Sequence, residues 1–154
     1  MRWIALAGMA LVALSTSASG GSSPGPFMGR WRITGAVTAP WSDRAMRPDS
    51  AEARRLLGRI VIFTPSRIDA PRPLACAGPR YMRHAVPPDE LFQGNLSQPG
   101  QQARGLGFGP GAVVTLETGC AGWIEFHFSD RDTAMFALND RIYTIRRLAP
   151  PGAR

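Results

Sequence analysis

The fold is decided by residues 112–148, which read AVVTLETGCAGWIEFHFSDRDTAMFALNDRIYTIRRL. Apolar and polar residues alternate there in four short segments, and residues typical of turns lie between them. These segments are 112–118, 123–129, 133–138 and 141–148. Alternation with a period of two is typical of half-buried strands, and short polar turns are typical of hairpins. The stretch therefore predicts a consecutive antiparallel meander of four strands.

The apolar side chains also predict how these strands align. Leu116 opposite Phe126 would place an aliphatic side chain against an aromatic one. A three-residue loop at 130–132 and a turn at Asn139-Asp140 then extend this alignment through the meander. The further pairs that we expect are Val114 with Phe128, Phe126 with Phe136, Ile124 with Leu138, and Phe136 with Tyr143. A shift by one residue would scatter this apolar face.

The first half of the chain predicts shorter elements. Strands are expected at 27–34, 59–63, 67–69 and 81–86, and a single helical turn at 87–92. The segment 49–58, DSAEARRLLG, predicts one short helix with Asp49 as its N-cap and Gly58 after its end. Residues 94–111 are rich in glycine, which predicts a long loop, or a loop with one weak strand around Leu106 and Phe108.

These elements together predict one all-β domain over residues 27–149. We expect a single antiparallel barrel of about eight strands, or a strongly curved sheet, with the C-terminal meander and one short helix. The length of 154 residues suits one domain, and 17 glycines with 14 prolines are typical of short strands joined by tight turns. Residues 21–26 are expected to be a disordered leader and residues 150–154 a disordered tail.

Residues 1–20 predict a secretory signal peptide. Arg2 precedes an apolar run at 4–14, and the small residues Ala18 and Gly20 would occupy the −3 and −1 positions of a cleavage site. The run is about half of the roughly 20 residues that a membrane-spanning helix needs. We therefore expect Sec-type export of a bacterial protein that is periplasmic or secreted and has no integral membrane anchor. No cysteine precedes Cys76, which excludes a lipid anchor on a processed N-terminal cysteine.

The two cysteines of the chain, Cys76 and Cys120, are interpreted in the light of this export. Two cysteines in an oxidising compartment most simply form one disulfide bond. The chain lacks a CxxC pair and a nearby histidine that would favour a metal site instead. We therefore predict a disulfide between them.

A short motif at the start of the first expected strand points to a family. The tripeptide Gly29-Arg30-Trp31 resembles the GxW signature of the lipocalins and their calycin relatives. In that family an arginine near the last strand packs over the tryptophan and closes the barrel. The resemblance implies this role for Arg147, with Arg146 as the alternative, and structural roles for Gly29 and Trp31. It also implies that the barrel binds a small apolar or amphiphilic ligand.

The charge of the chain has an unusual composition. The formal net charge is +7, and all 18 basic residues are arginine because the chain has no lysine. This excludes Schiff-base and P-loop lysine chemistry. If the first and last strands pair, Arg30, Arg32 and Arg146 meet on the outer surface, where arginine forks would suit anionic envelope ligands. Nucleic acid is not an expected partner, because export would separate the protein from its usual nucleic acid targets and no aromatic-basic motif is present.

Motifs for catalysis and metal binding are missing from the sequence. It contains no HExxH, no GxSxG and no histidine pair at metal-ligand spacing, so we expect no catalytic residue, no metal and no cofactor. The expected alignment does place Glu117 opposite Glu125 on the face of His127, an arrangement that can separate two pKa values. Since this face points away from the apolar side, we interpret it as a solvated outer surface.

Two functions remain for such a protein. We expect an exported, non-enzymatic β-barrel that binds a small apolar, amphiphilic or anionic envelope ligand, with Arg30, Arg32, Arg146 and Trp41 as candidate binding residues. Trp41 has a second interpretation, as a loop residue anchored in the core. The alternative function is a protein-binding module such as an inhibitor of a secreted hydrolase. Against a basic enzyme, a basic inhibitor would have to use its acidic meander.

Overall fold

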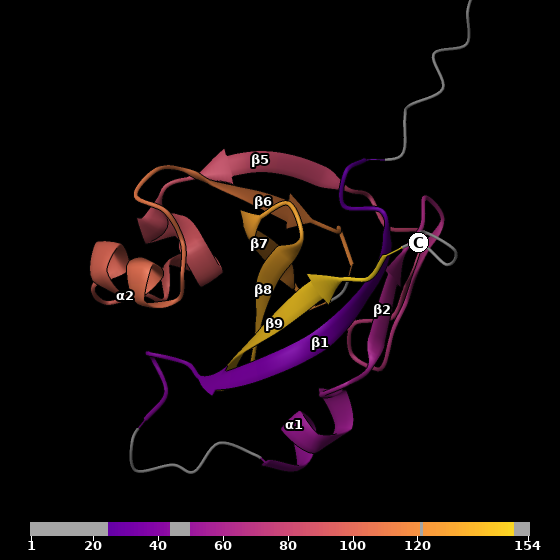
Figure 1. Cartoon of the computed structure of the whole chain (residues 1–154), viewed down its shortest axis with the longest axis horizontal. Coiled ribbons are helices and arrows are strands. Elements are labelled where there is room, and N and C mark those ends of the chain that lie inside the picture. Colours follow the sequence, from indigo (N-terminus) through magenta and orange to yellow (C-terminus); the bar gives the residue numbers. More distant parts are fainter. Residues whose placement is uncertain (1–24, 44–49, 121, 150–154) are drawn as a thin grey trace, which may run out of the picture.

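The chain folds into one strongly curved antiparallel sheet in the computed structural model (Figure 1). The structure describes residues 25–43, 50–120 and 122–149, and within these ranges it has nine strands and three short helices. The strands are β1 (Gly29–Thr38), β2 (Ile60–Phe63), β3 (Arg67–Asp69), β4 (Cys76–Ala77), β5 (Met82–Val86), β6 (Val113–Glu117), β7 (Glu125–Asp130), β8 (Thr133–Leu138) and β9 (Arg141–Arg147). The helices are α1 (Ser50–Leu56), the 3₁₀ helix η1 (Pro88–Gly94) and α2 (Pro99–Gly105).

The strand order is that of an up-and-down barrel with one open seam. It runs β4-β3-β2-β1-β9-β8-β7-β6-β5, so that pairing strands are consecutive in the chain except where β1 meets β9. The seam lies between β4 and β5, the two edges of the sheet. The predicted all-β fold is confirmed, with more strands than the eight expected and more helices than the one expected.

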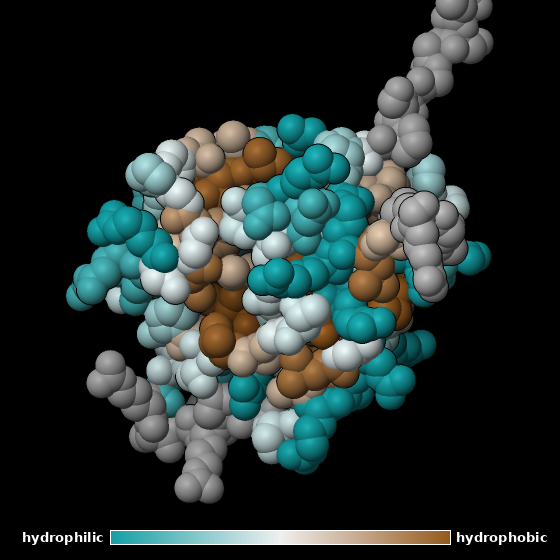
Figure 2. All heavy atoms as spheres, in the orientation of Figure 1, coloured by the Kyte–Doolittle hydropathy of each residue, from teal (hydrophilic) through white to brown (hydrophobic). Residues whose placement is uncertain are grey.

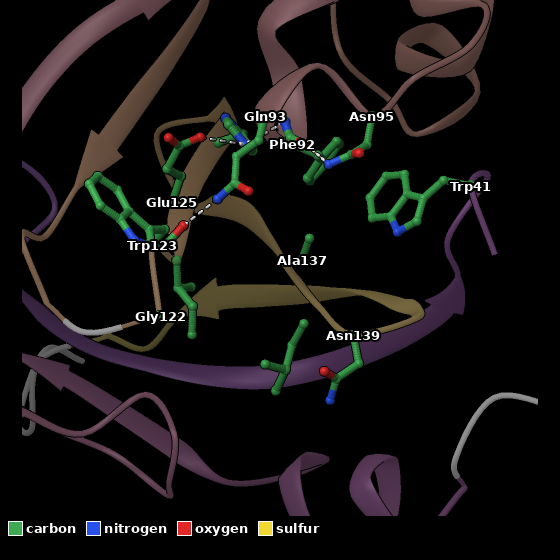
Figure 3. A pocket seen from close by; sticks show the side chains of 12 residues that line it. Trp41, Phe92, Gln93, Asn95, Gly122, Trp123, Glu125, Ala137 and Asn139 are labelled. Carbon is green, nitrogen blue, oxygen red and sulfur yellow. Dashed lines mark hydrogen bonds and ion pairs between the residues drawn. The ribbon is translucent and has the colours of Figure 1, made fainter.

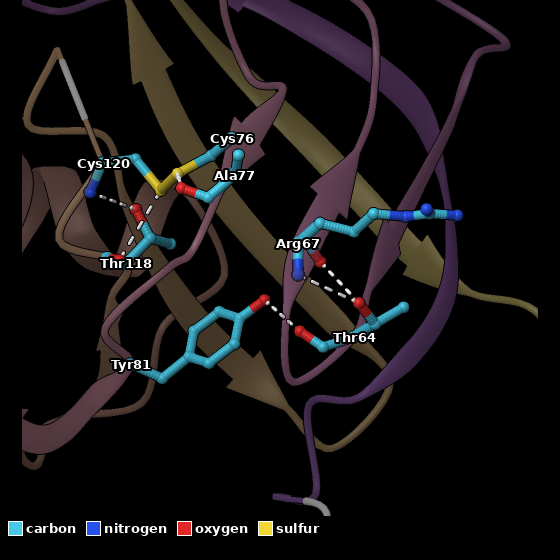
Figure 4. The surroundings of a disulfide bond; sticks show 7 residues. All are labelled: Thr64, Arg67, Cys76, Ala77, Tyr81, Thr118 and Cys120. Atoms are coloured by element: carbon cyan, nitrogen blue, oxygen red, sulfur yellow. Dashed lines mark hydrogen bonds between the residues drawn. A yellow bond between two sulfur atoms is a disulfide. The ribbon is translucent and has the colours of Figure 1, made fainter.

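Covalent and polar contacts bridge this seam (Figure 4). Cys76 of β4 forms a disulfide with Cys120, which follows β6, and this confirms the predicted bond. The hydroxyl of Tyr81 donates a hydrogen bond to the carbonyl of Thr64 at 2.9 Å. Burial raises the pKa of Tyr81 to about 12, so this hydroxyl keeps its proton. The two edges of the sheet are therefore held together without pairing directly.

The alignment predicted for the meander is present. Leu116 pairs with Phe126 and Phe136 with Tyr143, as expected. One detail differs: Asp130 pairs with Thr133, so the loop expected at 130–132 is shortened to a two-residue turn. A bulge between Phe128 and Asp130 takes up the extra residue, which leaves the apolar pairs before it unchanged.

Large side chains fill the interior of the barrel. The fully buried ones include Trp31, Ile33, Phe63, Phe126, Phe136 and Tyr143. The helix α1 closes one end with Ala53 and Leu56, and the predicted helix is confirmed there. Phe27 packs its ring against those of Phe63 and Tyr81 near the start of β1, at the opposite end. The interior is therefore a packed core.

A second core lies on the outside of the sheet. Here η1, α2 and the residues that follow them place Leu91, Phe92, Leu96, Ala103 and Phe108 against Val86, Val113 and Ile142. The prediction of a loop over residues 94–111 is wrong, because α2 occupies part of it. Pro99 stands at the start of this helix, where the missing N–H costs nothing, and Ala103 is buried. The glycine content concealed this short helix.

Several predictions fall on residues outside the described ranges. They are the signal peptide at 1–20, the tail at 150–154, the N-cap Asp49 and most of the leader. Of the leader, Pro26 is described, and its carbonyl accepts a hydrogen bond from the guanidinium of Arg147. Among the helices that the structure describes, none has the length and apolar character required to cross a membrane.

Candidate functional site

A groove of about 230 Å³ lies where β7 begins and β8 ends (Figure 3). Segments far apart in the sequence form its walls. They contribute Trp41 after β1, Phe92 and Gln93 from η1, Trp123 and Glu125 at the start of β7, and Ala137 and Asn139 at the end of β8. The groove lies between the two cores, because Phe92 belongs to the second core and the lining residues Ile124 and Leu138 pack against the core of the barrel.

The shape of η1 depends on a buried histidine beneath it. The backbone N–H of Phe92 donates a hydrogen bond to Nε2 of His127 at 3.0 Å. Nδ1 of the same ring lies 2.8 Å from the hydroxyl of Thr115. Because Nε2 accepts, the proton of the neutral ring resides on Nδ1, which donates to Thr115. The two contacts of the imidazole thus hold η1 against the sheet.

The backbone of η1 turns sharply at this contact. Phe92 and Gln93 both have a positive φ, 52° and 60°, in the left-handed region that non-glycine residues seldom adopt. The turn sends the Gln93 side chain across the groove, where its amide donates to the carbonyl of Trp123 at 2.6 Å (Figure 3). Strained backbone of this kind persists where the surroundings hold it, and His127 supplies that hold.

The outer face around His127 is not the solvated surface that the sequence suggested. Its side chain is 1% exposed, because η1 covers it and the Phe92 ring packs 4.6 Å from the imidazole. Burial, with a smaller effect from His84, lowers the pKa of His127 to about 4. The ring is therefore neutral near pH 7. A period of two tells which face a residue occupies, and it does not tell whether another element covers that face.

Two carboxylates lie at the edge of this covered face. Glu117 pairs with Glu125, as expected. Burial raises the pKa of Glu125, and the neighbouring Glu117 raises it further. Glu117 lies 3.4 Å from Nε2 of His84, and Glu125 lies 3.7 Å from Nε2 of the neutral His127. Within the described residues neither carboxylate forms an ion pair with arginine, so Glu125 gives the wall of the groove an acidic group that no arginine neutralises.

The two tryptophans of the groove differ in their surroundings. Trp41 is half-buried, packs 5.7 Å from the Phe92 ring and also lines the groove, so it serves both as an anchor and as a wall. Trp123 is 84% exposed and has a φ of 51°. It precedes β7, and the strand expected from residue 123 begins only at Glu125. A second groove, of about 340 Å³, lies beside Trp123 and the two carboxylates.

The predicted arginines lie elsewhere. Arg32 of β1 pairs with Arg146 of β9, and Arg30 lies on the same outer face. Arg147 packs over Trp31, with its guanidinium carbon 4.2 Å from the ring centroid. Arg147 and not the alternative Arg146 makes that contact, because Arg146 is exposed and lies opposite Arg32 on the outer face. The groove thus combines Trp41, Glu125 and His127, which the sequence pointed to, with residues that it did not, among them Phe92, Gln93 and Asn139.

Comparisons with known proteins add no relative. No family model, curated protein or solved structure matches the chain. The lipocalin resemblance therefore stays a prediction carried by Gly29, Trp31 and Arg147. Among the described residues, no group of three or more His, Cys, Asp or Glu side chains is placed to hold a metal ion. The chemistry available in the groove is aromatic contact, amide hydrogen bonding and negative charge.

The groove residues that were not predicted carried little signal in the sequence. Phe92 stands at the end of the helical turn predicted for residues 87–92, Gln93 follows that turn, and Asn139 belongs to the predicted turn at Asn139-Asp140. Their positions in the groove depend on how η1 and the β8–β9 turn pack onto the sheet. Such contacts join segments that are distant in the chain, and local patterns do not report them.

Proposed function

We propose that this protein is a non-enzymatic binding protein that takes a small amphiphilic ligand in the outer groove. The observation that carries the proposal is that Trp41, Gln93 and Glu125 face one groove although three separate segments supply them. A binding site needs apolar contact together with a few placed polar groups, and the groove offers both. The packed interior, with Trp31 and Phe126 fully buried, favours this outer site over a ligand inside the barrel.

The groove favours ligands with hydrogen-bond donors. The side-chain amide of Gln93 donates to the Trp123 carbonyl, and that of Asn139 donates to the Glu52 carboxylate. Their oxygen atoms and the Glu125 carboxylate leave the groove rich in acceptors. Since His127 is neutral, an anionic ligand would meet only negative charge. Hydroxyl or ammonium groups are therefore the preferred partners.

The aromatic wall supplies the apolar half of the recognition. Trp41 offers flat, partly accessible ring surface beside these acceptors, and the buried Phe92 ring packs against it. A volume of about 230 Å³ is below the usual range for drug-sized ligands, so it suits a single ring. A hydroxylated ring with one apolar face, such as a neutral or amino sugar, meets all three requirements. Glycans of the cell envelope would supply such rings to an exported protein.

A titration with three related sugars tests this proposal. Protein labelled with ¹⁵N is titrated with glucosamine, N-acetylglucosamine and glucuronate, and amide shifts are followed by NMR. We expect glucosamine to bind most tightly, N-acetylglucosamine more weakly and glucuronate not at all, because Glu125 attracts a cation and repels an anion. Trp41→Ala should weaken binding at least about 10-fold, and Glu125→Gln should remove the preference for glucosamine over N-acetylglucosamine.

A matched control and an apolar probe make the result decisive. Leu57→Ala removes an exposed apolar side chain on another part of the surface and should leave the titrations unchanged. Laurate serves as the apolar probe for a ligand inside the barrel. Shifts of Trp31 and Phe126 with laurate, together with unaltered sugar titrations for Trp41→Ala, would contradict the proposal.

One observation favours a second function, the binding of a protein partner. Trp123 is 84% exposed beside Glu117 and Glu125, and exposed tryptophan is enriched among the residues that dominate protein interfaces. The negative charge would suit a basic partner such as a secreted lysozyme. Binding of purified lysozyme that Trp123→Ala abolishes and Trp41→Ala leaves intact would support this function. Sugar binding with the opposite dependence would favour the small-ligand function.

A further inference from the structure

Three arginines form a ridge outside the groove. Arg32 on β1 lies directly opposite Arg146 on β9, and Arg30 lies two residues further along the same face of β1. Residues opposite each other in antiparallel strands have Cα atoms roughly 5 Å apart. All three side chains are exposed, and Figure 2 shows hydrophilic side chains gathered where β9 meets β1. We call these three residues the arginine ridge.

The ridge has no counter-charge of its own. Within the described residues, none of its side chains forms an ion pair, whereas Arg67 and Arg147 pair with Asp69 and Asp132. These two aspartates are the acidic residues near the ridge in the strand pairing, and other arginines already neutralise them. Like charges opposite each other destabilise a sheet. The ridge therefore lowers the stability of the fold, and no ion pair within the described residues compensates for this loss.

Apolar side chains adjoin the ridge on the same face. Ile60 pairs with Arg32 and Ile62 with Arg30 across β1 and β2, and both isoleucines are only half-buried. They do not belong to either core. The outer face of these strands thus places guanidinium groups beside partly exposed isoleucines. Such a surface matches the boundary between lipid headgroups and acyl chains.

We infer that the arginine ridge docks the protein onto an anionic lipid surface. Planar guanidinium groups bind phosphate oxygens through paired hydrogen bonds, and Ile60 and Ile62 would contact the headgroup boundary. A bilayer fits this ridge better than a single phosphate compound does, because the arginines lie side by side on the outer face of paired strands and line neither of the two grooves at Trp123. In the described part of the chain, the strand partners of Arg32 and Arg30 on β2 are Ile60 and Ile62, which cannot stack on nucleic acid bases as aromatic rings do.

Vesicle co-sedimentation tests the inference with the full chain. Vesicles of phosphatidylcholine with about one third phosphatidylglycerol are compared with pure phosphatidylcholine at low salt. We expect binding only to the anionic vesicles, and we expect it to weaken as salt is added. The triple variant Arg30→Gln, Arg32→Gln, Arg146→Gln should partition roughly 100-fold more weakly, on the basis of the usual contribution of each arginine near such a surface.

A control variant separates the ridge from net charge. Arg54→Gln, Arg83→Gln and Arg104→Gln remove the same charge from exposed positions on α1, β5 and α2. This control should bind anionic vesicles nearly as well as the wild type. Equal losses in both triple variants would overturn the inference, and so would wild-type binding by the ridge variant. Near-UV circular dichroism checks that each variant is folded. If the triple ridge variant does not fold, Arg146→Gln alone is used in its place, and we expect it to bind anionic vesicles about fivefold more weakly than the wild type.

Two competitors test the kind of anion. Inorganic phosphate at millimolar concentration should release no more protein from the vesicles than sodium chloride of the same ionic strength does. Displacement by phosphate beyond that effect, or equally tight binding of a DNA duplex at the same salt, would contradict a lipid surface as the partner. The sugar titrations of the ridge variant should match those of the wild type, because the groove lies elsewhere.

Discussion

The guanidinium carbon of Arg147 lies 4.2 Å from the centroid of the Trp31 ring. The same side chain donates hydrogen bonds to the carbonyl of Met28 at 2.9 Å and to the carboxylate of Asp132 at 3.0 Å. Trp31 in turn donates from Nε1 to the carbonyl of Phe27. This contact therefore ties the segment before β1, the β7–β8 turn and the last strand into one cluster at the end of the barrel opposite α1.

Replacing Arg147 by lysine should destabilise the fold. Lysine keeps the positive charge and loses the planar fork, so it cannot hold both carbonyl and carboxylate partners while lying on the indole. We expect the free energy of unfolding in urea to fall by about 2 kcal/mol. Arg146→Lys at the neighbouring exposed position should change it by less than about 0.5 kcal/mol. Equal effects of the two substitutions would contradict a structural role for Arg147.

The stability of the protein should fall in mild acid because of His127. Burial lowers the pKa of this group to about 4 from its ordinary 6.5, so between these values the unfolded state binds the proton more tightly. Stability is therefore unaffected above about pH 7 and is lost as the pH falls towards 4, by up to about 3 kcal/mol. Urea unfolding at pH 7.5, 6 and 5 measures this slope.

Two histidine variants isolate the group responsible for that slope. Glu125, whose pKa burial raises, contributes with the opposite sign, so the comparison must be made between variants. His127→Gln should be less stable at pH 7.5 and should lose most of the slope between pH 7 and 5. His84→Gln, at a half-exposed position, should retain it. A slope that survives in His127→Gln would show that another group is responsible.

Reduction of the disulfide should loosen the seam of the barrel. Cys76 and Cys120 are separated by 44 positions and join the two edge regions of the sheet. Loop-closure entropy predicts a loss of about 4 kcal/mol when the bond is removed. Urea unfolding of the wild type with and without reductant measures this loss, and the variant Cys76→Ser, Cys120→Ser should match the reduced protein. An unchanged midpoint after reduction would mean that the contacts of Tyr81 suffice to hold the seam.

Trp123 should contribute nothing measurable to folding. Its side chain is 84% exposed, so Trp123→Ala should change the free energy of unfolding by less than about 0.5 kcal/mol. By contrast, Trp31→Ala empties part of the core and should cost about 4 kcal/mol. Thermal melts compare the two variants. A large loss for Trp123→Ala would assign this residue to the fold and weaken the argument for a protein partner.

The strand pattern of this protein could be predicted from local sequence because its signal is local. Leu116 and Phe126 alternate with polar neighbours, and hydrophobic burial then determines which face and which alignment the strands adopt. The pairing of Cys76 with Cys120 followed from their number together with the expected export to an oxidising compartment. The position of Arg147 over Trp31 agrees with the role that the family resemblance implied.

The groove could not be predicted in the same way. Trp41, Gln93 and Glu125 come from three segments that are distant in the chain. A local pattern describes one segment at a time, so it does not show that these three residues lie close together. The alternation at His127 identified its face and said nothing of the cover that η1 provides. The sequence by itself determined most of the strands, the alignment of the meander and the disulfide, because these depend on periodicity and composition, whereas the two-residue strand β4 is too short to show a period. Only the tertiary structure decided that the interior is full and that a groove lies at its edge, because both depend on contacts between distant segments.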